Sequence, residues 1–325
     1  MPITSVNSDL QALTLTVVGD YAVPVERLWA AWADPRQIER FWGPPTWPAT
    51  FTRHDLVEAG RSEYFMTGPE GEKAGGYWEY TSVDAPRSFE IRDGFVGEDG
   101  VDNDEMPVTL MRADFEATPE GSRFTLVSTF PSQEAMEQLV AMGMVEGLSS
   151  ALAQLDGVLA ELREYASGRG TELHIVDDTH VRITRLISGT VEQVWRAHHE
   201  PELLQRWLLG PEGWTMPVCE VATTVGEKYR YEWEAVDGSA RFGFEGELLE
   251  VEPPHRAVST ENMIGVPGPG TVNELTLVAA EGGTLLTLVI TYPSLELRDM
   301  ILATGMVDGM ETSYARLERE VLTSA

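Results

Sequence analysis

The stretch VERLW at residues 25–29 decides the fold of this 325-residue chain, because it occurs a second time as VEQVW at residues 191–195. Other short matches follow in the same order, at offsets between 162 and 168 residues. They pair residues 34–35 with 200–201, 40–44 with 206–211, 83–87 with 251–255, 130–132 with 292–294, and 143–147 with 305–309. Matches that keep one order through both halves indicate an internal duplication.

The duplication predicts two domains, residues 10–166 and 171–325, joined by the short linker SGRG at residues 167–170. Each copy begins with an alternating strand, and a capping box of Thr190 and Gln193 marks a short helix after the second of these. Glycine-rich turns then separate several short strands, and a long amphipathic helix closes each copy. This order of elements predicts an α+β unit.

The repeated motifs resemble the START/Bet v 1-like (SRPBCC) superfamily. They are most similar to its branch of homologues of the activator of the heat-shock chaperone ATPase. The resemblance implies a helix-grip fold in tandem, in which a curved antiparallel sheet wraps a long C-terminal helix. It also implies binding of small molecules, since members of the superfamily are associated with lipids, polyketides and other natural products, including self-resistance proteins that sequester enediynes.

The charge of the chain narrows the choice of partners. It carries 53 acidic and 23 basic residues, a formal charge of −30, and the two halves share it as −17 and −13. This field disfavours nucleic acids and anionic membranes. The single cysteine, Cys219, excludes an internal disulfide, and we find neither a signal peptide nor a membrane-spanning apolar run. We therefore expect a cytoplasmic monomer in which the two copies form a pseudo-dimer.

The sequence assigns no catalytic residue, metal ligand or cofactor. It lacks a nucleophile elbow, a phosphate loop, a dinucleotide fingerprint and a zinc-binding helix. Cys219 is expected to be a small buried residue, and His54 receives no role. The adjacent His198 and His199 point about 100° apart on a helix, which favours a solvated helix end over a metal site. The acidic run at residues 98–105 lacks EF-hand spacing and is interpreted as a solvated loop.

Candidate binding residues come from an alignment of two strands. Matching Gly60 with Gly226 places Glu63, Phe65 and Thr67 opposite Tyr229, Tyr231 and Trp233, with each set on one strand face. On the concave face these residues would line a cavity, aromatic in the second copy and carrying a carboxylate in the first; otherwise they fill an ordinary core. The cavity candidates are Trp42, Trp47, Glu63, Phe65, Trp78, Tyr80, Met144, Trp207, Trp214, Tyr229, Tyr231, Trp233, Met306 and Met310.

Glycines near the closing helices have two interpretations. Gly143, Gly147, Gly305 and Gly309 either leave room for a ligand or mark a break between a short helix and the long one.

Three functions remain open from the sequence. The leading one is binding of a hydrophobic or aromatic small molecule of natural-product type, in biosynthesis or self-resistance. The second is a polyketide cyclase or aromatase, with Glu63 as base and Tyr64, Tyr80 or Tyr229 as hydrogen-bond partners. The third is a chaperone-associated interaction module, suggested by the family resemblance alone.

Overall fold

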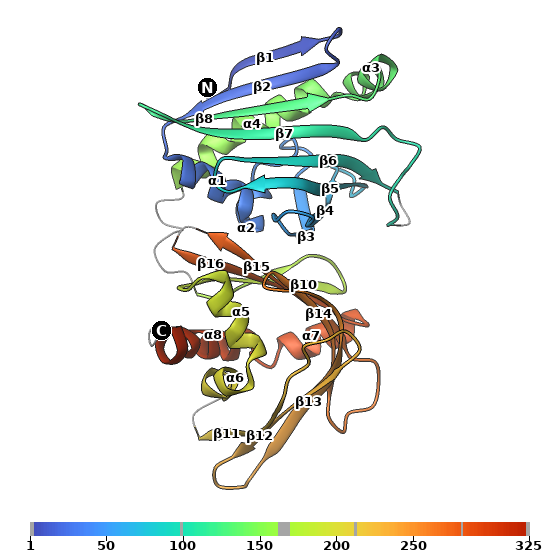
Figure 1. Ribbon diagram of the computed structural model, residues 1–325. Coiled ribbons are helices and arrows are strands. Elements are labelled where there is room, and N and C mark those ends of the chain that lie inside the picture. Colours follow the sequence, from blue (N-terminus) through green and yellow to red (C-terminus); the bar gives the residue numbers. More distant parts are fainter. Residues whose placement is uncertain (1–2, 98–99, 162–169, 211–212, 281, 323–325) are drawn as a thin grey trace. The chain divides into compact units, whose positions relative to one another are not determined.

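A computed structural model describes residues 3–97, 100–161, 170–210, 213–280 and 282–322. The chain divides into two compact units, which we call the first unit (Met1–Ser167) and the second unit (Gly168–Ala325) (Figure 1). Within the described residues, no helix has both the length and the apolar character needed to cross a bilayer.

The first unit is an eight-stranded antiparallel sheet with four helices, and its strands lie in the order β1-β2-β8-β7-β6-β5-β4-β3 (Figure 1). Its elements are β1 (Ile3–Asp9), β2 (Thr14–Tyr21), α1 (Val25–Ala33), α2 (Pro35–Ile38), β3 (Ala49–His54), β4 (Arg61–Thr67), β5 (Lys73–Asp84), β6 (Ser88–Val96), β7 (Thr109–Thr118), β8 (Gly121–Thr129), α3 (Gln133–Ala141) and α4 (Met144–Glu161).

The second unit repeats this plan, with the sheet order β11-β12-β13-β14-β15-β16-β10-β9. Its elements are β9 (Glu172–Ile175), β10 (His180–Ile187), α5 (Val191–His199), α6 (Pro201–Trp207), β11 (Trp214–Glu220), β12 (Lys228–Ala235), β13 (Arg241–Glu252), β14 (Arg256–Met263), β15 (Thr271–Ala280), β16 (Gly283–Thr291), α7 (Leu295–Leu302), α8 (Met306–Leu317) and a π-helical turn (Glu318–Leu322). The predicted tandem of α+β helix-grip units is therefore confirmed.

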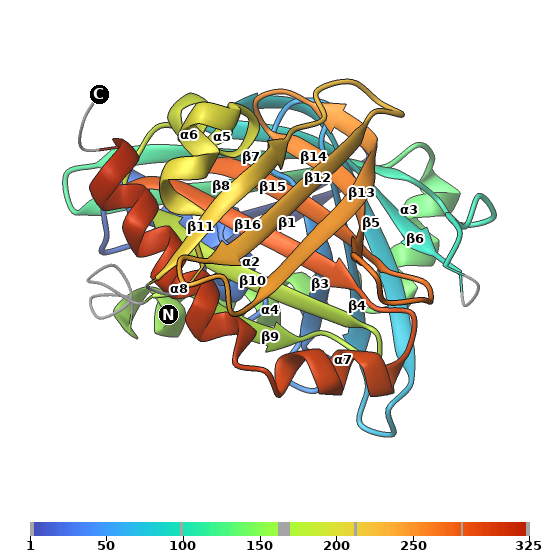
Figure 2. The same cartoon turned by 90° about the horizontal axis from the view of Figure 1, so that it is seen from below.

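The helices of the second unit lie on the concave side of its sheet. Figures 1 and 2 show α5, α6 and α8 inside the curve of strands β11 to β16. Tyr314 and Leu317 of α8 share a buried cluster with Leu277 and Leu286 of the sheet. The long helix thus buries its apolar stripe against the sheet, which is the arrangement that its amphipathic pattern predicts.

Matching polar caps begin the helices in both units. Thr190 and Gln193 form the predicted capping box at the start of α5. Ser132 and Ser294 cap α3 and α7, and each hydroxyl accepts a hydrogen bond from the backbone N–H three residues later. Because each cap satisfies a helix donor that would otherwise lack a partner, the same local chemistry fixes the same starts in both copies.

Glycine separates the last two helices of each unit. Gly143 has φ +90° and Gly305 has φ +79°, which are left-handed conformations that favour glycine. These two residues confirm the helix-break interpretation. Gly147 and Gly309 instead lie inside α4 and α8, and a Cβ added to either would meet no atom within 4 Å.

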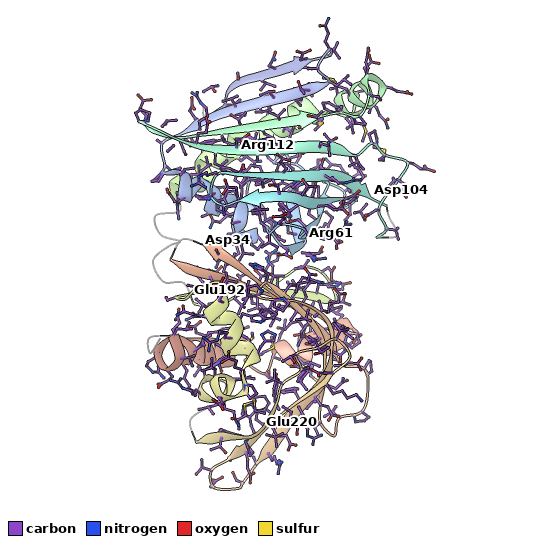
Figure 3. All side chains as sticks on the ribbon, viewed as in Figure 1. Asp34, Arg61, Asp104, Arg112, Glu192 and Glu220 are labelled. Carbon is purple, nitrogen blue, oxygen red and sulfur yellow. The ribbon has the colours of Figure 1, made fainter. Side chains whose placement is uncertain are left out.

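Charged side chains cover the outer faces of both units (Figure 3). Arg112 of β7 pairs with Glu90 on the neighbouring strand β6 and with Asp114 two residues along its own strand. Such exposed pairs contribute at most about 1 kcal/mol each, so the interiors determine how the two units differ.

Candidate functional site

The two sheets correspond strand by strand, but the correspondence differs by one residue from the one that the sequence predicts. The left-handed residue before β4 is Ala59, with φ +62°, and the one before β12 is Gly226, with φ +88°. Ala59 therefore matches Gly226, and the alignment of Gly60 with Gly226 was wrong. Because side chains alternate along a strand, a slip of one residue exchanges the inner and outer faces.

The corrected register removes Glu63 and Phe65 from the interior. Ser62 of β4 is fully buried, so its neighbours along the strand face outward. The Glu63 side chain is 43% exposed, and its Oε1 accepts a hydrogen bond from Arg61 Nε at 2.7 Å. The Phe65 ring lies 3.8 Å from Lys73 Nζ. The predictions that Glu63 carries cavity chemistry, and that it serves as a catalytic base, are therefore wrong.

Aromatic side chains fill the interior of the first unit. Trp32 stacks on Phe124 at 4.9 Å, and Trp42 meets Trp78 edge to face at 4.8 Å. Most of the buried apolar residues of this unit join in one cluster. Three predicted cavity residues belong to that core, namely Trp42 (6% exposed), Trp78 (1%) and Tyr80 (2%). Met144 packs half-buried at its edge, and Trp47 is also half-buried.

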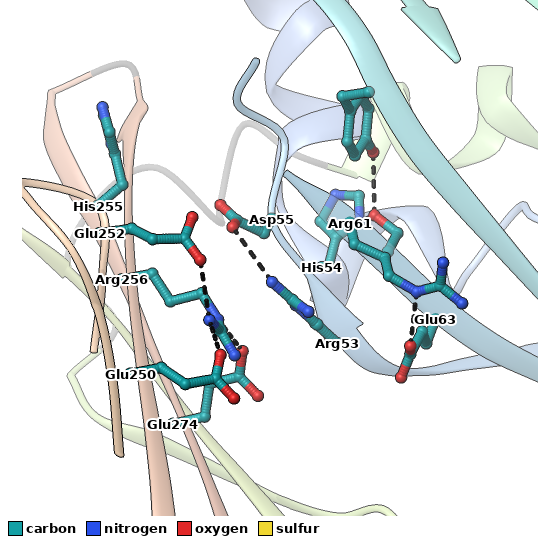
Figure 4. A network of polar contacts seen from close by, with 12 residues as sticks. Arg53, His54, Asp55, Arg61, Glu63, Glu250, Glu252, His255, Arg256 and Glu274 are labelled. Carbon is teal, nitrogen blue, oxygen red and sulfur yellow. Dashed lines mark hydrogen bonds and ion pairs between the residues drawn. The ribbon is translucent and has the colours of Figure 1, made fainter. Parts of the chain in front are cut away.

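A chain of polar groups crosses this core (Figure 4). His54 Nε2 lies 2.8 Å from the Trp32 carbonyl, to which it donates, so Nδ1 of the neutral ring accepts from Ser62 Oγ at 2.9 Å. The Tyr80 hydroxyl then donates to Ser62 at 3.0 Å. A serine beside a histidine is the geometry of an activated nucleophile, but both are buried among aromatic rings with exposed fractions of 0% and 4%. This chain therefore stabilises the core.

The second unit has a divided and partly accessible interior. Its buried apolar residues form three separate clusters. Four inner-face residues of its sheet are half-buried, whereas their counterparts in the first unit are at most 3% exposed. In order, the pairs are Ile91 and Ser259, Met111 and Asn273, Ala113 and Leu275, and Leu126 and Leu288.

Large and small side chains have exchanged places between the two units. Ser62 faces Trp78 across β4 and β5, whereas Tyr229 faces Gly246 across β12 and β13. A Cβ on Gly246 would approach Tyr229 Cε1 to 2.7 Å, so the tyrosine occupies the space that a side chain on Gly246 would need. Other exchanges only remove volume, since Phe51 and Phe89 correspond to Cys219 and Ala257.

Polar groups replace apolar ones on the inner face of the second sheet. The cross-strand pair Ile91–Met111 becomes Ser259–Asn273. Tyr292 takes the place of Phe130 in the repeated FPS and YPS segments, and it is only 2% exposed. Its hydroxyl has no hydrogen-bond partner within the described part of the chain. At these three positions the second unit therefore presents hydrogen-bonding groups where the first unit has apolar side chains.

Both units hold a half-buried carboxyl at the same position, Asp93 on β6 and Glu261 on β14. Each lies opposite a threonine of the next strand, Thr109 or Thr271. Burial raises the pKa of Asp93 to about 7, although the Trp78 indole N–H donates to Oδ1 at 2.9 Å and opposes the shift. Burial also raises the pKa of Glu261, against a hydrogen bond from Asn273.

The sequence analysis missed both acids. The available signal was that each follows alternating inner-face residues, Phe89 and Ile91 or Ala257 and Ser259, at the same offset in the two copies.

The charge of Glu261 affects the pKa of three tyrosines in the second unit. Burial raises the pKa of Tyr229, Tyr231 and Tyr292, and the Glu261 charge raises it further in each. The Tyr229 hydroxyl donates to the Thr260 carbonyl at 2.8 Å. Glu261 remains half-buried by exposure. Asp93 is half-buried as well, so it is the neighbouring side chains that distinguish the two acids.

The remaining predicted residues of the second unit lie around the same interior. Trp207 is 2% exposed and donates from Nε1 to the Ala197 carbonyl, and Trp233 donates to the Leu208 carbonyl. Trp214 meets Phe242 edge to face at 5.2 Å. Met306 and Met310 pack half-buried against the sheet from α8.

The adjacent histidines do not form a solvated helix end. The Nδ1 atoms of His198 and His199 donate to the carbonyls of Val194 and Trp195. Burial lowers the pKa of both, to about 4 for His198. The solvated interpretation was wrong because α5 turns both rings against other side chains, with His199 stacked on Trp195 at 3.8 Å.

Cys219 and the acidic run at residues 98–105 make packing contacts and ion pairs within the protein. Cys219 packs against the core, and burial raises its thiol pKa to about 11. In the acidic run at 98–105, residues 98 and 99 lie outside the described residues. Asp102 of this run forms an ion pair with Arg61 at 2.5 Å. Across the described ranges, no group of three or more His, Cys, Asp or Glu side chains is placed to hold a metal ion.

Solved structures resemble this chain over half of its length. Protein Ms6760 from Mycobacterium smegmatis is 50% identical over 49% of this chain and 97% of its own, with a TM-score of 0.46. A protein from Arthrobacter aurescens is 46% identical over 49% of this chain and 92% of its own, with a TM-score of 0.47. A Rhodobacter sphaeroides protein is 30% identical over 48% and 100%, with a TM-score of 0.46.

No curated protein matches the chain. A family model matches it twice, at residues 22–160 and 188–321, which together span most of both units. The chain therefore belongs to the family described as Activator of Hsp90 ATPase homolog 1-like protein, and it carries two copies of that family's domain.

Proposed function

We propose that the second unit binds a hydrophobic or aromatic small molecule between its sheet and α8, and that the first unit is a filled copy of the same fold. The observation that carries this proposal is the accessibility of equivalent positions. Leu126 of the first sheet is 2% exposed, whereas its counterpart Leu288 is half-buried. A ligand would cover the inner surface that the second unit leaves accessible.

The lining suits an aromatic guest. Tyr229, Tyr231 and Trp233 stand in a row on β12, and neighbouring rings are 5.0 and 6.3 Å apart. Phe242 stacks on Trp233 at 5.0 Å from the next strand. Aromatic walls with a few placed polar groups are how small-molecule sites are commonly built. Ligands of natural-product type fit this lining, and the family resemblance supports such a role in biosynthesis or self-resistance, in a cytoplasmic monomer.

A test can use the first unit as a template for closing the second. The double variant Ala257→Phe/Ser259→Ile places the residues of Phe89 and Ile91 at the equivalent positions. Tryptophan fluorescence titrations with a panel of polycyclic aromatics are expected to show saturable binding to the parent protein and at least tenfold weaker binding to the double variant. Thr215→Phe adds an aromatic ring at an exposed position of β11 and should leave binding unchanged.

Two results would oppose the proposal. If no aromatic in the panel binds the parent, the interior is not a ligand site of this class. If the double variant folds and binds as tightly as the parent, the ligand lies elsewhere.

Because Glu63 faces outward, it cannot be the base of a polyketide cyclase. One observation still supports the cyclase hypothesis. Glu261 is a half-buried carboxyl with a raised pKa beside tyrosine hydroxyls, and such a group can move protons. Turnover of a bound polyketide that stops in Glu261→Gln, with binding retained, would support an enzyme.

A further inference from the structure

We propose that the ligand of the second unit carries a positively charged nitrogen, that Glu261 is its counter-ion, and that this unit therefore selects apolar amines. The inference rests on the proposed function, and it adds the chemical class of the ligand. It is carried by the placement of Glu261 among aromatic rings and neutral polar groups.

Glu261 is a half-buried acid without a basic partner among the described residues. Among the residues that the structure describes, no arginine, lysine or histidine is hydrogen-bonded to it or ion-paired with it. The buried arginine that acts on the neighbouring Tyr292 is Arg298, and it is already engaged, because it donates to the Asp299 carboxylate and to the Asp177 carbonyl. The one side-chain hydrogen bond that acts on Glu261 comes from Asn273. A cation that enters this interior therefore has an acid available to pair with.

The groups that surround Glu261 are suited to a cation. Tyr229 and Tyr231 of β12 act on Glu261 electrostatically, and their rings lie 5.0 Å apart. The face of an aromatic ring attracts an ammonium group, most strongly where water is excluded. From the end of β16, Tyr292 brings a buried hydroxyl with no partner within the described chain, and its oxygen can accept a hydrogen bond from an N–H. Because Glu261 acts on all three tyrosines, an ammonium group bound beside its carboxylate would lie close to the rings and to the Tyr292 hydroxyl as well.

The groups around Glu261 disfavour a negatively charged ligand. A carboxylate ligand, such as a fatty acid, would place a second negative charge beside Glu261 in a poorly solvated interior. The surface acts in the same direction, since a formal charge of −30 concentrates cations and repels anions around the protein. Both the approach and the final site therefore favour an amine.

The first unit provides an internal contrast. Asp93 occupies the same position but accepts a hydrogen bond from the Trp78 indole, and its neighbours Ile91 and Met111 are buried apolar residues. The phenylalanine Phe130 stands where the second unit has Tyr292. Asp93 is half-buried like Glu261, but its inner-face neighbours are fully buried and its carboxylate already accepts the indole hydrogen bond, so we assign it no ligand.

The experiment compares three naphthalene probes of one shape. Calorimetric or fluorescence titrations at pH 7.5 use 2-naphthylmethylamine, the neutral 2-naphthylmethanol and the anionic 2-naphthoate. The amine is expected to bind about tenfold tighter than the alcohol, and the naphthoate more weakly than both. Glu261→Gln should weaken amine binding about tenfold while leaving the alcohol unchanged.

Two matched variants serve as controls. Asp93→Asn removes the equivalent acid of the first unit, and Glu220→Gln removes an exposed acid of the second unit. Both should keep the preference for the amine. If Glu220→Gln lowers it as much as Glu261→Gln does, the preference comes from the general surface field and the assignment of Glu261 is overturned.

Failure of this inference is distinct from failure of the proposed function. Equal binding of amine and alcohol to the parent protein overturns the cation site but leaves an apolar pocket. Absence of binding by all three probes, together with the polycyclic panel, removes the pocket as well.

Discussion

Asp93 and Glu261 occupy the same place in the two sheets, each facing the interior opposite a threonine of the neighbouring strand. Around them the two copies differ, since Asp93 contacts a tryptophan indole and Glu261 an asparagine amide. The same half-buried acid position is therefore bordered by fully buried apolar residues in the first unit and by half-buried polar residues in the second. The difference between the units arises from the neighbours of the acid.

Replacing Asp93 by asparagine should change how stability depends on pH. The folded-state pKa of about 7 exceeds the ordinary value of 3.8, so the folded state binds the proton more tightly than the unfolded state. Stability from this group is complete below pH 3.8 and is lost as the pH rises through 7, at up to about 1.4 kcal/mol per pH unit.

Asp93→Asn should therefore gain about 1 to 2 kcal/mol relative to the parent between pH 5 and pH 7, in urea unfolding followed by tryptophan fluorescence. Parallel pH profiles for variant and parent would show that Asp93 is ionised without penalty.

The buried chain from His54 to Tyr80 should be cooperative. Ser62→Ala removes the hydroxyl that links the two rings and leaves the Tyr80 hydroxyl buried without this acceptor, at a cost of about 1–3 kcal/mol. Tyr80→Phe should cost less, because Ser62 can still donate to His54. In a double-mutant cycle by urea unfolding, the double variant should lose less stability than the sum of the singles. Strict additivity would mean that the three groups do not act as a chain.

Two glycines of the second unit should respond in opposite directions to alanine. A Cβ on Gly246 would meet Tyr229 and, closer still, the backbone oxygen of Thr260, so Gly246→Ala should lose about 3 kcal/mol. Gly309 lies exposed within α8 and would meet nothing, so Gly309→Ala should gain about 1 kcal/mol. Thermal unfolding of the two variants measures the contrast. A stable Gly246→Ala would indicate that β13 can move away from β14.

The thiol of Cys219 should react slowly at neutral pH. Burial raises its pKa to about 11, so the reactive thiolate is a very small fraction at pH 7.5. Because the chain has no other cysteine, the rate of iodoacetamide labelling by mass spectrometry reports this residue alone. The rate should rise about tenfold per pH unit from 7.5 to 9.5. A plateau by pH 9 would contradict the raised pKa.

The fold was predictable from the sequence because the features that reveal the duplication are short-range ones. The caps at Thr190 and Ser294, the glycine turns and the leucine spacing of the closing helices act within a few residues of themselves. The serine caps at Ser132 and Ser294 and the glycine turns occur in both copies, and the structure confirms the architecture that they indicate.

The candidate site was predicted less well, because it depends on register and on neighbours that are distant in sequence. The left-handed position before β4 is held by Ala59, so matching the glycines of the two copies shifted the strand by one residue. The aromatic row on β12 was placed correctly on one face, but Glu63 was not. Asp93 and Glu261 look like ordinary acids in the sequence, and only burial by other strands changes their pKa.

The exchange between Ser62–Trp78 and Tyr229–Gly246 constrains how one unit evolved from the other. Changing one member of a pair first gives either two large side chains, which collide, or two small ones, which leave a void. Collision deforms the sheet, whereas a void costs stability but leaves the chain folded. The order of substitutions that keeps the protein folded therefore passes through a state in which both positions carry small side chains. In that state one copy has an unfilled space in its core. A second, filled copy in the same polypeptide keeps one stably packed unit present while the other passes through that intermediate.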